Sequence, residues 1–69
     1  MFPFRRFVLR RRAVVNLVDG TAIEGLLYRK SGPLLVLKDA HHLEPGKDPL
    51  AIDGDTVIER RQVLFIQAL

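Results

Sequence analysis

The chain has 69 residues and no cysteine, so disulfides and cysteine-based zinc sites are excluded. Its 48% hydrophobic and 28% charged residues are typical of a folded domain rather than of a disordered segment. A chain of this length buries only about 60% of the surface that its unfolded form exposes. Another subunit is the remaining common source of stability, which predicts an oligomer or a component of a larger assembly.

The net charge of +3 is distributed unevenly along the chain. Residues 1–12 contain five arginines and no acid, whereas residues 13–69 contain six Lys or Arg and eight Asp or Glu. The sequence therefore predicts a slightly acidic domain, 13–69, that carries a basic arm, 1–12. We expect the arm to dock on an acidic partner such as a nucleic-acid backbone, a membrane surface or a protein, although a solvated tail also explains it. Its arginines are Arg5, Arg6, Arg10, Arg11 and Arg12.

The arm also contains three of the four phenylalanines. If the arm is helical, Phe4, Phe7 and Val8 share one face, but so short a helix is marginal unless it packs against something. The arginine pair at 5–6 resembles an export signal, yet charged residues interrupt the apolar run that such a signal needs. No apolar run approaches the roughly 20 residues of a membrane span. We expect a cytoplasmic protein, or one within a virion assembled in the cytoplasm.

Residues 13–18 form the first expected strand, because their side chains are mostly apolar and β-branched. Asp19 and Gly20 follow as a hairpin signal, since a type I′ turn needs positive φ at both central residues. The second expected strand runs over 21–30 and contains Gly25. A glycine inside a strand indicates a sharp bend or a close approach of two backbones, and a small barrel needs such a bend.

A turn at 31–33 precedes the third expected strand, 34–37, whose two faces are both apolar. Both faces should therefore be covered, by a subunit contact or by the arm. Residues 40–51 are expected to form the longest loop, because they contain two prolines and a glycine. The remaining segments are a turn at 53–55, a strand at 56–59, a bend at 60–62 and a last strand at 63–67. The sequence predicts a single all-β domain, a small barrel of five short strands.

Two patterns of apolar residues and glycines run through these strands. The first reads Val15-x-Leu17-x-Asp19-Gly20-Thr21-x-x-x-Gly25-x-Leu27, followed by Leu35-x-Leu37-x-Asp39-Ala40. The second reads Gly54-x-x-Val57-Ile58, followed by Val63-x-Phe65-Ile66. In this order they resemble the two motifs of the Sm and Sm-like proteins, and the resemblance covers about residues 10–67.

The resemblance implies a strongly bent, open five-stranded barrel behind a short N-terminal helix or arm. It also implies rings of about five to eight subunits, joined edge to edge between the fourth and fifth strands. A ring agrees with the strand pattern, because it pairs the edges that an open sheet leaves unpaired. Five residues are then expected at the subunit interface, or alternatively in the core of one subunit: Val57, Ile58, Leu64, Phe65 and Ile66.

The loops depart from the pattern of family members that bind RNA. Those members carry an Asp and an Asn between the second and third strands, whereas residues 28–33 contain neither. They also carry a basic residue and a glycine between the fourth and fifth strands, where this chain has Glu59 and Arg60. The Lys-His pair of the bacterial host-factor chaperone is absent as well. The resemblance therefore does not carry the usual base-binding pocket onto this chain.

Basic residues near the same two loops still allow binding of nucleic acid. In a ring they can line a pore and contact phosphates without sequence preference. They are Arg29, Lys30, Arg60 and Arg61. Tyr28 can stack on a base or simply pack on its strand.

The sequence contains no pattern that points to catalysis. Ser31 is the only serine and has no candidate base near it in the sequence. His41 and His42 are adjacent, so in an extended segment they point to opposite faces and do not readily chelate one metal. Asp53 and Asp55 flank a turn glycine, and turn chemistry explains both. We expect a protein that is not an enzyme and that uses no metal and no cofactor.

Two functions remain. The first is an interaction and assembly module that forms homo-oligomeric rings, with the arm docking on a protein partner in a larger assembly. A looser resemblance to small Sm-like chains encoded among phage particle genes suggests a structural phage protein. The alternative is a ring that binds RNA or single-stranded DNA through phosphate contacts. We do not expect a membrane partner, because the aromatic and basic arm lacks a clean apolar face.

Overall fold

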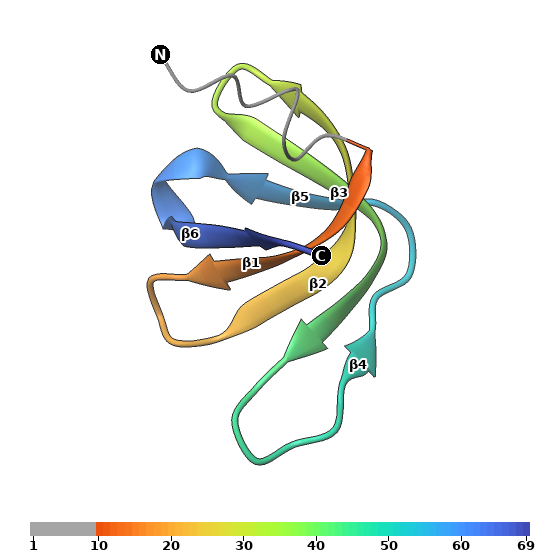
Figure 1. The fold of residues 1–69 in the computed structure, drawn as a ribbon, viewed down its shortest axis with the longest axis vertical. Coiled ribbons are helices and arrows are strands. Elements are labelled where there is room, and N and C mark those ends of the chain that lie inside the picture. Colours follow the sequence, from red (N-terminus) through yellow and green to blue (C-terminus); the bar gives the residue numbers. More distant parts are fainter. Residues whose placement is uncertain (1–9) are drawn as a thin grey trace.

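The computed structural model describes residues 10–69, which form one antiparallel sheet (Figure 1). Its order is β4-β3-β2-β1-β6, and β5 pairs with the end of β3 opposite to β4. Both long strands curve strongly, so the sheet wraps around one core as an open barrel (Figure 1). The elements are β1 (Arg11–Leu17), β2 (Ala22–Ser31), β3 (Leu34–Leu43), β4 (Leu50–Ala51), β5 (Thr56–Glu59), the 3₁₀ turn η1 (Arg60–Gln62) and β6 (Val63–Ala68).

The bent all-β sheet confirms the predicted fold class. The expected N-terminal helix or arm falls largely on residues 1–9, outside the described part of the chain. β1 begins at Arg11, two residues before the predicted strand, so Arg11 and Arg12 are strand residues.

The prediction of one long loop over 40–51 was wrong. β3 continues to Leu43, and Leu50–Ala51 form β4 against it. His42 lies opposite Leu50 and His41 opposite Ala51. Because His41 and His42 are adjacent polar residues, the alternation of apolar residues does not indicate this extension. The prolines and the glycine belong only to the short connection at 44–49.

The core lies on the concave side of the sheet and consists of alternate residues of its strands. Leu35 and Leu37 of β3 are fully buried, whereas Leu34 and Val36, which alternate with them, are only half-buried. This alternation places one face of each strand inward. The buried hydrophobic residues are Ala13, Val15, Ile23, Leu27, Leu35, Leu37, Ala40 and Ile58.

Gly25 allows β2 to approach β3, as the sequence predicts. A Cβ at this position would lie 3.0 Å from the Ala40 Cα and 3.1 Å from the Lys38 carbonyl oxygen. The register between β2 and β3 shifts on either side of the glycine, between Glu24 and Leu26. The absent side chain therefore leaves room for a close approach of β2 to β3, and the bulge beside it bends the sheet.

The hairpin after β1 forms where predicted, but its turn type differs. Gly20 has φ of +92°, whereas Asp19 does not have the positive φ that a type I′ turn requires. The Gly20 N–H donates to the Leu17 carbonyl at 3.1 Å, so Val18 and Asp19 are the central residues of the turn. The Thr21 hydroxyl and N–H both donate to Asp19 Oδ1, at 2.7 and 2.9 Å, which fixes the shifted turn.

Substitution Gly25→Val should destabilise the fold because its side chain would collide with the backbone of β3. We expect the free energy of unfolding to fall by about 1–3 kcal/mol, measured by urea denaturation. Ala22→Val on the outer face of the same strand serves as the control and should change it by less than about 0.5 kcal/mol. Equal effects of the two substitutions would contradict the role of Gly25.

Candidate nucleic-acid and subunit interface

Two basic loops lie together at one end of the barrel. The first is the β2–β3 turn and the second is η1, and the Arg60 N–H donates to the Pro33 carbonyl at 2.7 Å. Lys30 Nζ donates to the Gly32 carbonyl at 3.0 Å. We call four residues at the end of β2 and in η1 the basic loop set: Arg29, Lys30, Arg60 and Arg61. The Arg60–Pro33 bond thus places η1 beside the turn that follows Arg29 and Lys30, about 30 positions earlier in the chain.

One acid accompanies the basic loop set. Glu59 Oε2 accepts a contact of 2.8 Å from Arg61 Nε, and the two side chains are 54% and 77% exposed. An ion pair this exposed contributes little stability and is easily exchanged for another anion. The guanidinium of Arg61 therefore stays accessible to a phosphate.

Tyr28 lies on β2 beside the basic loop set and contacts two cations. Lys38 Nζ lies 4.1 Å from the centre of its ring, and Arg10 Cζ lies 5.4 Å from it. Both distances are those of cation–π contacts. The ring is half-buried and both cations lie over it, so its base-stacking role stays a prediction.

The described arginines of the predicted arm make contacts within the protein. The Arg10 N–H donates to the Leu27 carbonyl at 2.7 Å, and the Arg11 guanidinium donates to the Leu69 carbonyl at 3.0 Å. Arg12 lies in a polar cluster on the outer face of the sheet. Arg5 and Arg6 lie outside the described residues, so their docking role stays a prediction.

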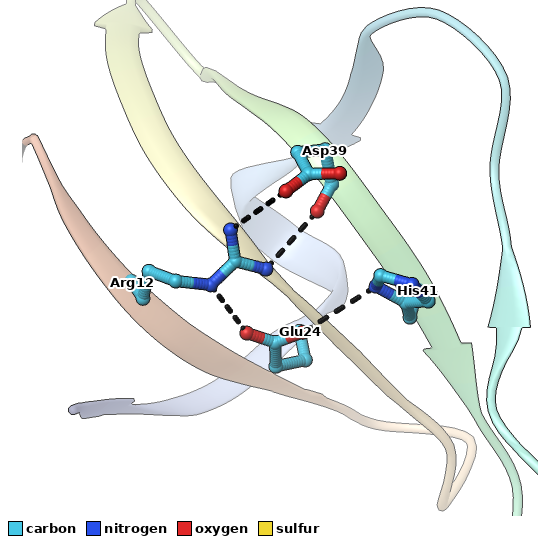
Figure 2. Close-up of polar contacts among 4 residues, drawn as sticks. All are labelled: Arg12, Glu24, Asp39 and His41. Atoms are coloured by element: carbon cyan, nitrogen blue, oxygen red, sulfur yellow. Dashed lines mark hydrogen bonds and ion pairs between the residues drawn. The ribbon is translucent and has the colours of Figure 1, made fainter.

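The polar cluster connects three strands through one guanidinium (Figure 2). Arg12 of β1 donates from Nε to Glu24 Oε2 of β2 at 2.8 Å. It also donates to the Asp39 side chain and to the Asp39 carbonyl of β3, both at 3.1 Å. His41 Nδ1 lies 3.5 Å from Glu24 Oε1 on the other side. Arg12 therefore holds Asp39, whose φ of +51° is rare for a residue with a side chain, in the bulged part of β3.

Hydrogen bonds lower the pKa of two carboxyl groups, Glu24 in the polar cluster and Asp19 in the β1–β2 turn. The hydrogen bond from Arg12 holds the pKa of the Glu24 carboxyl below its usual range, and it raises the pKa of Arg12. The hydrogen bond from the Thr21 hydroxyl lowers the pKa of Asp19 in the β1–β2 turn. Each carboxylate is therefore stabilised in its charged form.

The predicted interface residues divide into two groups. Val57, Leu64 and Phe65 are 56%, 65% and 51% exposed. Ile58 is 7% exposed and belongs to the core, and Ile66 packs against the core while partly buried. Within the described residues, β5 pairs only with β3 and β6 pairs only with β1, so each has an edge without a partner strand. The exposed group lies on these two edge strands.

Other residues considered in the sequence stay dispersed. Across residues 10–69, no three His, Cys, Asp or Glu side chains are placed to hold a metal ion. His42 Nδ1 lies 3.9 Å from Glu44 Oε1, and Ser31 is exposed at the end of β2. Asp53 and Asp55, the two acids that flank the turn glycine, are also exposed. In the same part of the chain, no helix is long and apolar enough to cross a membrane.

Three contributors to these sites were missed from sequence. Lys38 shares the outward face of β3 with Leu34 and Val36, a placement that the two-residue alternation could have shown. The sequence places Arg10 in the basic arm and does not indicate its contact with the Tyr28 ring. Arg12 was treated as part of a charge run, although an arginine on a strand commonly reaches across to an acid on the neighbouring strand.

Comparison with known proteins rests on the fold rather than on sequence. No family model matches the chain, and no curated protein matches it. The Sm protein of Pyrococcus abyssii, solved in complex with a uridine heptamer, superposes with a TM-score of 0.83 and 25% identity over 100% of both chains. The chain has the Sm-like fold.

Two further Sm structures are similar to the Sm-like chain. The SmAP1 heptamer of P. aerophilum has a TM-score of 0.81 at 25% identity, over 96% of this chain and 88% of that chain. A heptameric archaeal Sm protein gives the same TM-score and identity, over 96% of each chain. The resemblance predicted from the two sequence patterns is thereby confirmed for the fold.

The Arg12–Glu24 contact predicts a pH dependence of stability. Because the pKa of Glu24 is lower in the folded than in the unfolded chain, its contribution is complete above the unfolded pKa. It is lost as the pH falls through the folded pKa. We expect the melting temperature to fall between about pH 6 and about pH 3, and to fall less in the Glu24→Gln variant.

Asp48→Asn removes an exposed carboxylate of the β3–β4 connection and serves as the matched control. It should keep the pH dependence of the unsubstituted chain. An identical dependence of melting temperature on pH in Glu24→Gln would contradict the stabilising role of the Arg12–Glu24 contact.

Proposed function

We propose that the chain assembles edge to edge into a ring, β5 of one copy against β6 of the next. The observation that carries the proposal is that, among the residues the structure describes, both strands have an unpaired edge, and both strands expose apolar side chains. Open edges of this kind are templates for a further strand. Because the two edges differ, the contact is heterologous, and such contacts close into rings when the rotation allows.

The similar structures support this assembly. The SmAP1 structure of P. aerophilum and another archaeal Sm structure are both heptamers. The shared fold gives this chain the same strand order with which to form a ring, and the number of its subunits stays open.

A charge on one edge tests the ring. Phe65→Glu should convert the ring to single chains, because a carboxylate would be buried against the neighbouring β5. Light scattering coupled to size exclusion at micromolar concentration measures the mass. Val18→Glu places the same charge on an equally apolar, 56% exposed position in the β1–β2 turn and should leave the mass unchanged. An unsubstituted chain that is monomeric at this concentration would exclude the ring.

We further propose that the ring binds single-stranded nucleic acid through the basic loop set. Two loops held together by the Arg60–Pro33 bond place four cations at one end of each barrel. Ring closure would repeat this group around one axis and concentrate positive charge. The Pyrococcus abyssii Sm structure contains a uridine heptamer, which supports RNA as a ligand of this fold. The loops lack the side chains of a base pocket, so phosphate contacts with little sequence preference are expected.

The double substitution Arg60→Gln and Arg61→Gln tests this interface. We expect affinity for poly-U RNA and for single-stranded DNA to fall at least tenfold, with a smaller dependence on salt. Fluorescence anisotropy at two salt concentrations measures both quantities. Lys47→Gln removes an exposed cation of the β3–β4 connection and should have no effect. Unchanged binding and unchanged salt dependence in the double variant would rule out the basic loop set.

The other functional expectations remain proposals. We propose that the chain is not an enzyme, because its exposed Ser31 and dispersed acids offer no arrangement for catalysis. A cytoplasmic location, a protein partner for the arm and a place in a phage particle are predictions from sequence that the fold does not test.

A further inference from the structure

The basic loop set contains an anion of its own. Glu59 is the only Asp or Glu in the segments 28–34 and 58–63, which contain the two basic loops. It ends β5 and is followed directly by Arg60 and Arg61 of η1, in the connection between the two edge strands (Figure 1). Its Oε2 lies 2.8 Å from Arg61 Nε. A carboxylate therefore already contacts one guanidinium of the set.

The contact between Glu59 and Arg61 is not what holds the turn. Glu59 occupies the N-cap position of η1, but its side chain makes no capping hydrogen bond there. Backbone bonds hold the turn instead: the Arg60 N–H donates to the Pro33 carbonyl, and the Val63 N–H donates to the Arg60 carbonyl. Because both side chains of the ion pair are largely exposed, the pair adds little stability. Another anion can replace the carboxylate at Arg61 without loss of the fold.

Carboxylate and phosphate oxygens bind a guanidinium through the same charge-assisted hydrogen bonds. Glu59 occupies one donor of Arg61 and places a negative charge beside the others. A phosphate that reaches Arg61 must displace this carboxylate or bind against its repulsion. We propose that Glu59 is an internal competitor for the phosphate site at Arg61 and that it limits the affinity of the chain for single-stranded nucleic acid. This inference rests on the proposed function of the basic loop set and names the residue that restrains it.

Glu59→Gln tests the competition, because it keeps the size of the side chain and removes its charge. Affinity for poly-U RNA, measured by fluorescence anisotropy at low salt, should rise by about threefold or more. Asp48→Asn removes the same charge from the β3–β4 connection, at the other end of β3, and should leave the affinity unchanged. An equal rise in the two variants would reduce the effect to net charge and overturn the proposal.

A second background separates competition at Arg61 from general repulsion. In an Arg61→Gln chain the carboxylate has no guanidinium to occupy, so adding Glu59→Gln should raise the affinity far less than in the unsubstituted chain. Three cations of the basic loop set remain in this background, which keeps binding measurable. An equal gain in both backgrounds would overturn the proposal.

The same titrations distinguish failure of this inference from failure of the proposed function. If the unsubstituted chain binds poly-U and Glu59→Gln binds with the same affinity, the role of Glu59 is refuted and binding by the basic loop set stands. If neither chain binds poly-U at low salt, the proposed binding function is refuted, and this inference with it.

Discussion

The close approach of β2 to β3 at Gly25 is the constraint on which the rest of the barrel depends. A Cβ at Gly25 would lie 3.0 Å from the Ala40 Cα, which is tighter than an ordinary van der Waals contact, so its absence lets the two strands approach and the sheet fold over its own core. Arg12 reinforces the same region from outside by joining β1, β2 and the bulged turn of β3 (Figure 2). The bend therefore depends on a missing side chain within the sheet and a charged one on its surface.

The bend also determines which surfaces remain for function. It buries the inner face of β2 and β3 and, among residues 10–69, leaves β5 and β6 each with an unpaired edge, while the outer face of β3 keeps a half-buried apolar strip. Between residues 10 and 69, only eight hydrophobic residues are buried, and so small a core gives limited stability to a single chain. Pairing of the two edges would add both hydrogen bonds and apolar burial, so assembly and stability are coupled in this account.

Much of the fold could be predicted from sequence because local signals agreed with one another. The strand alternation, the hairpin glycine at 20 and the glycine at 25 each have a physical reason that holds before any tertiary contact. Sequence failed where tertiary contacts decided the outcome. The β3 extension depends on pairing of His41 and His42 with β4, and the Val18–Asp19 turn depends on hydrogen bonds from Thr21. The members of the basic loop set could be named from sequence, whereas Lys38 and Arg10 beside Tyr28 could not. Lys38 lies there through the shifted register of β2 and β3, and Arg10 through its backbone hydrogen bond to Leu27.

Hydrogen–deuterium exchange on the edge strands tests edge-to-edge assembly most directly. In a single barrel, the amides of 56–59 that face away from β3 and those of 63–68 that face away from β1 have no partner and exchange within the fastest class. The account predicts slow exchange for these amides in the unsubstituted chain and fast exchange in the Phe65→Glu variant. Fast exchange along both edges in the unsubstituted chain, at the concentration used for light scattering, would contradict it.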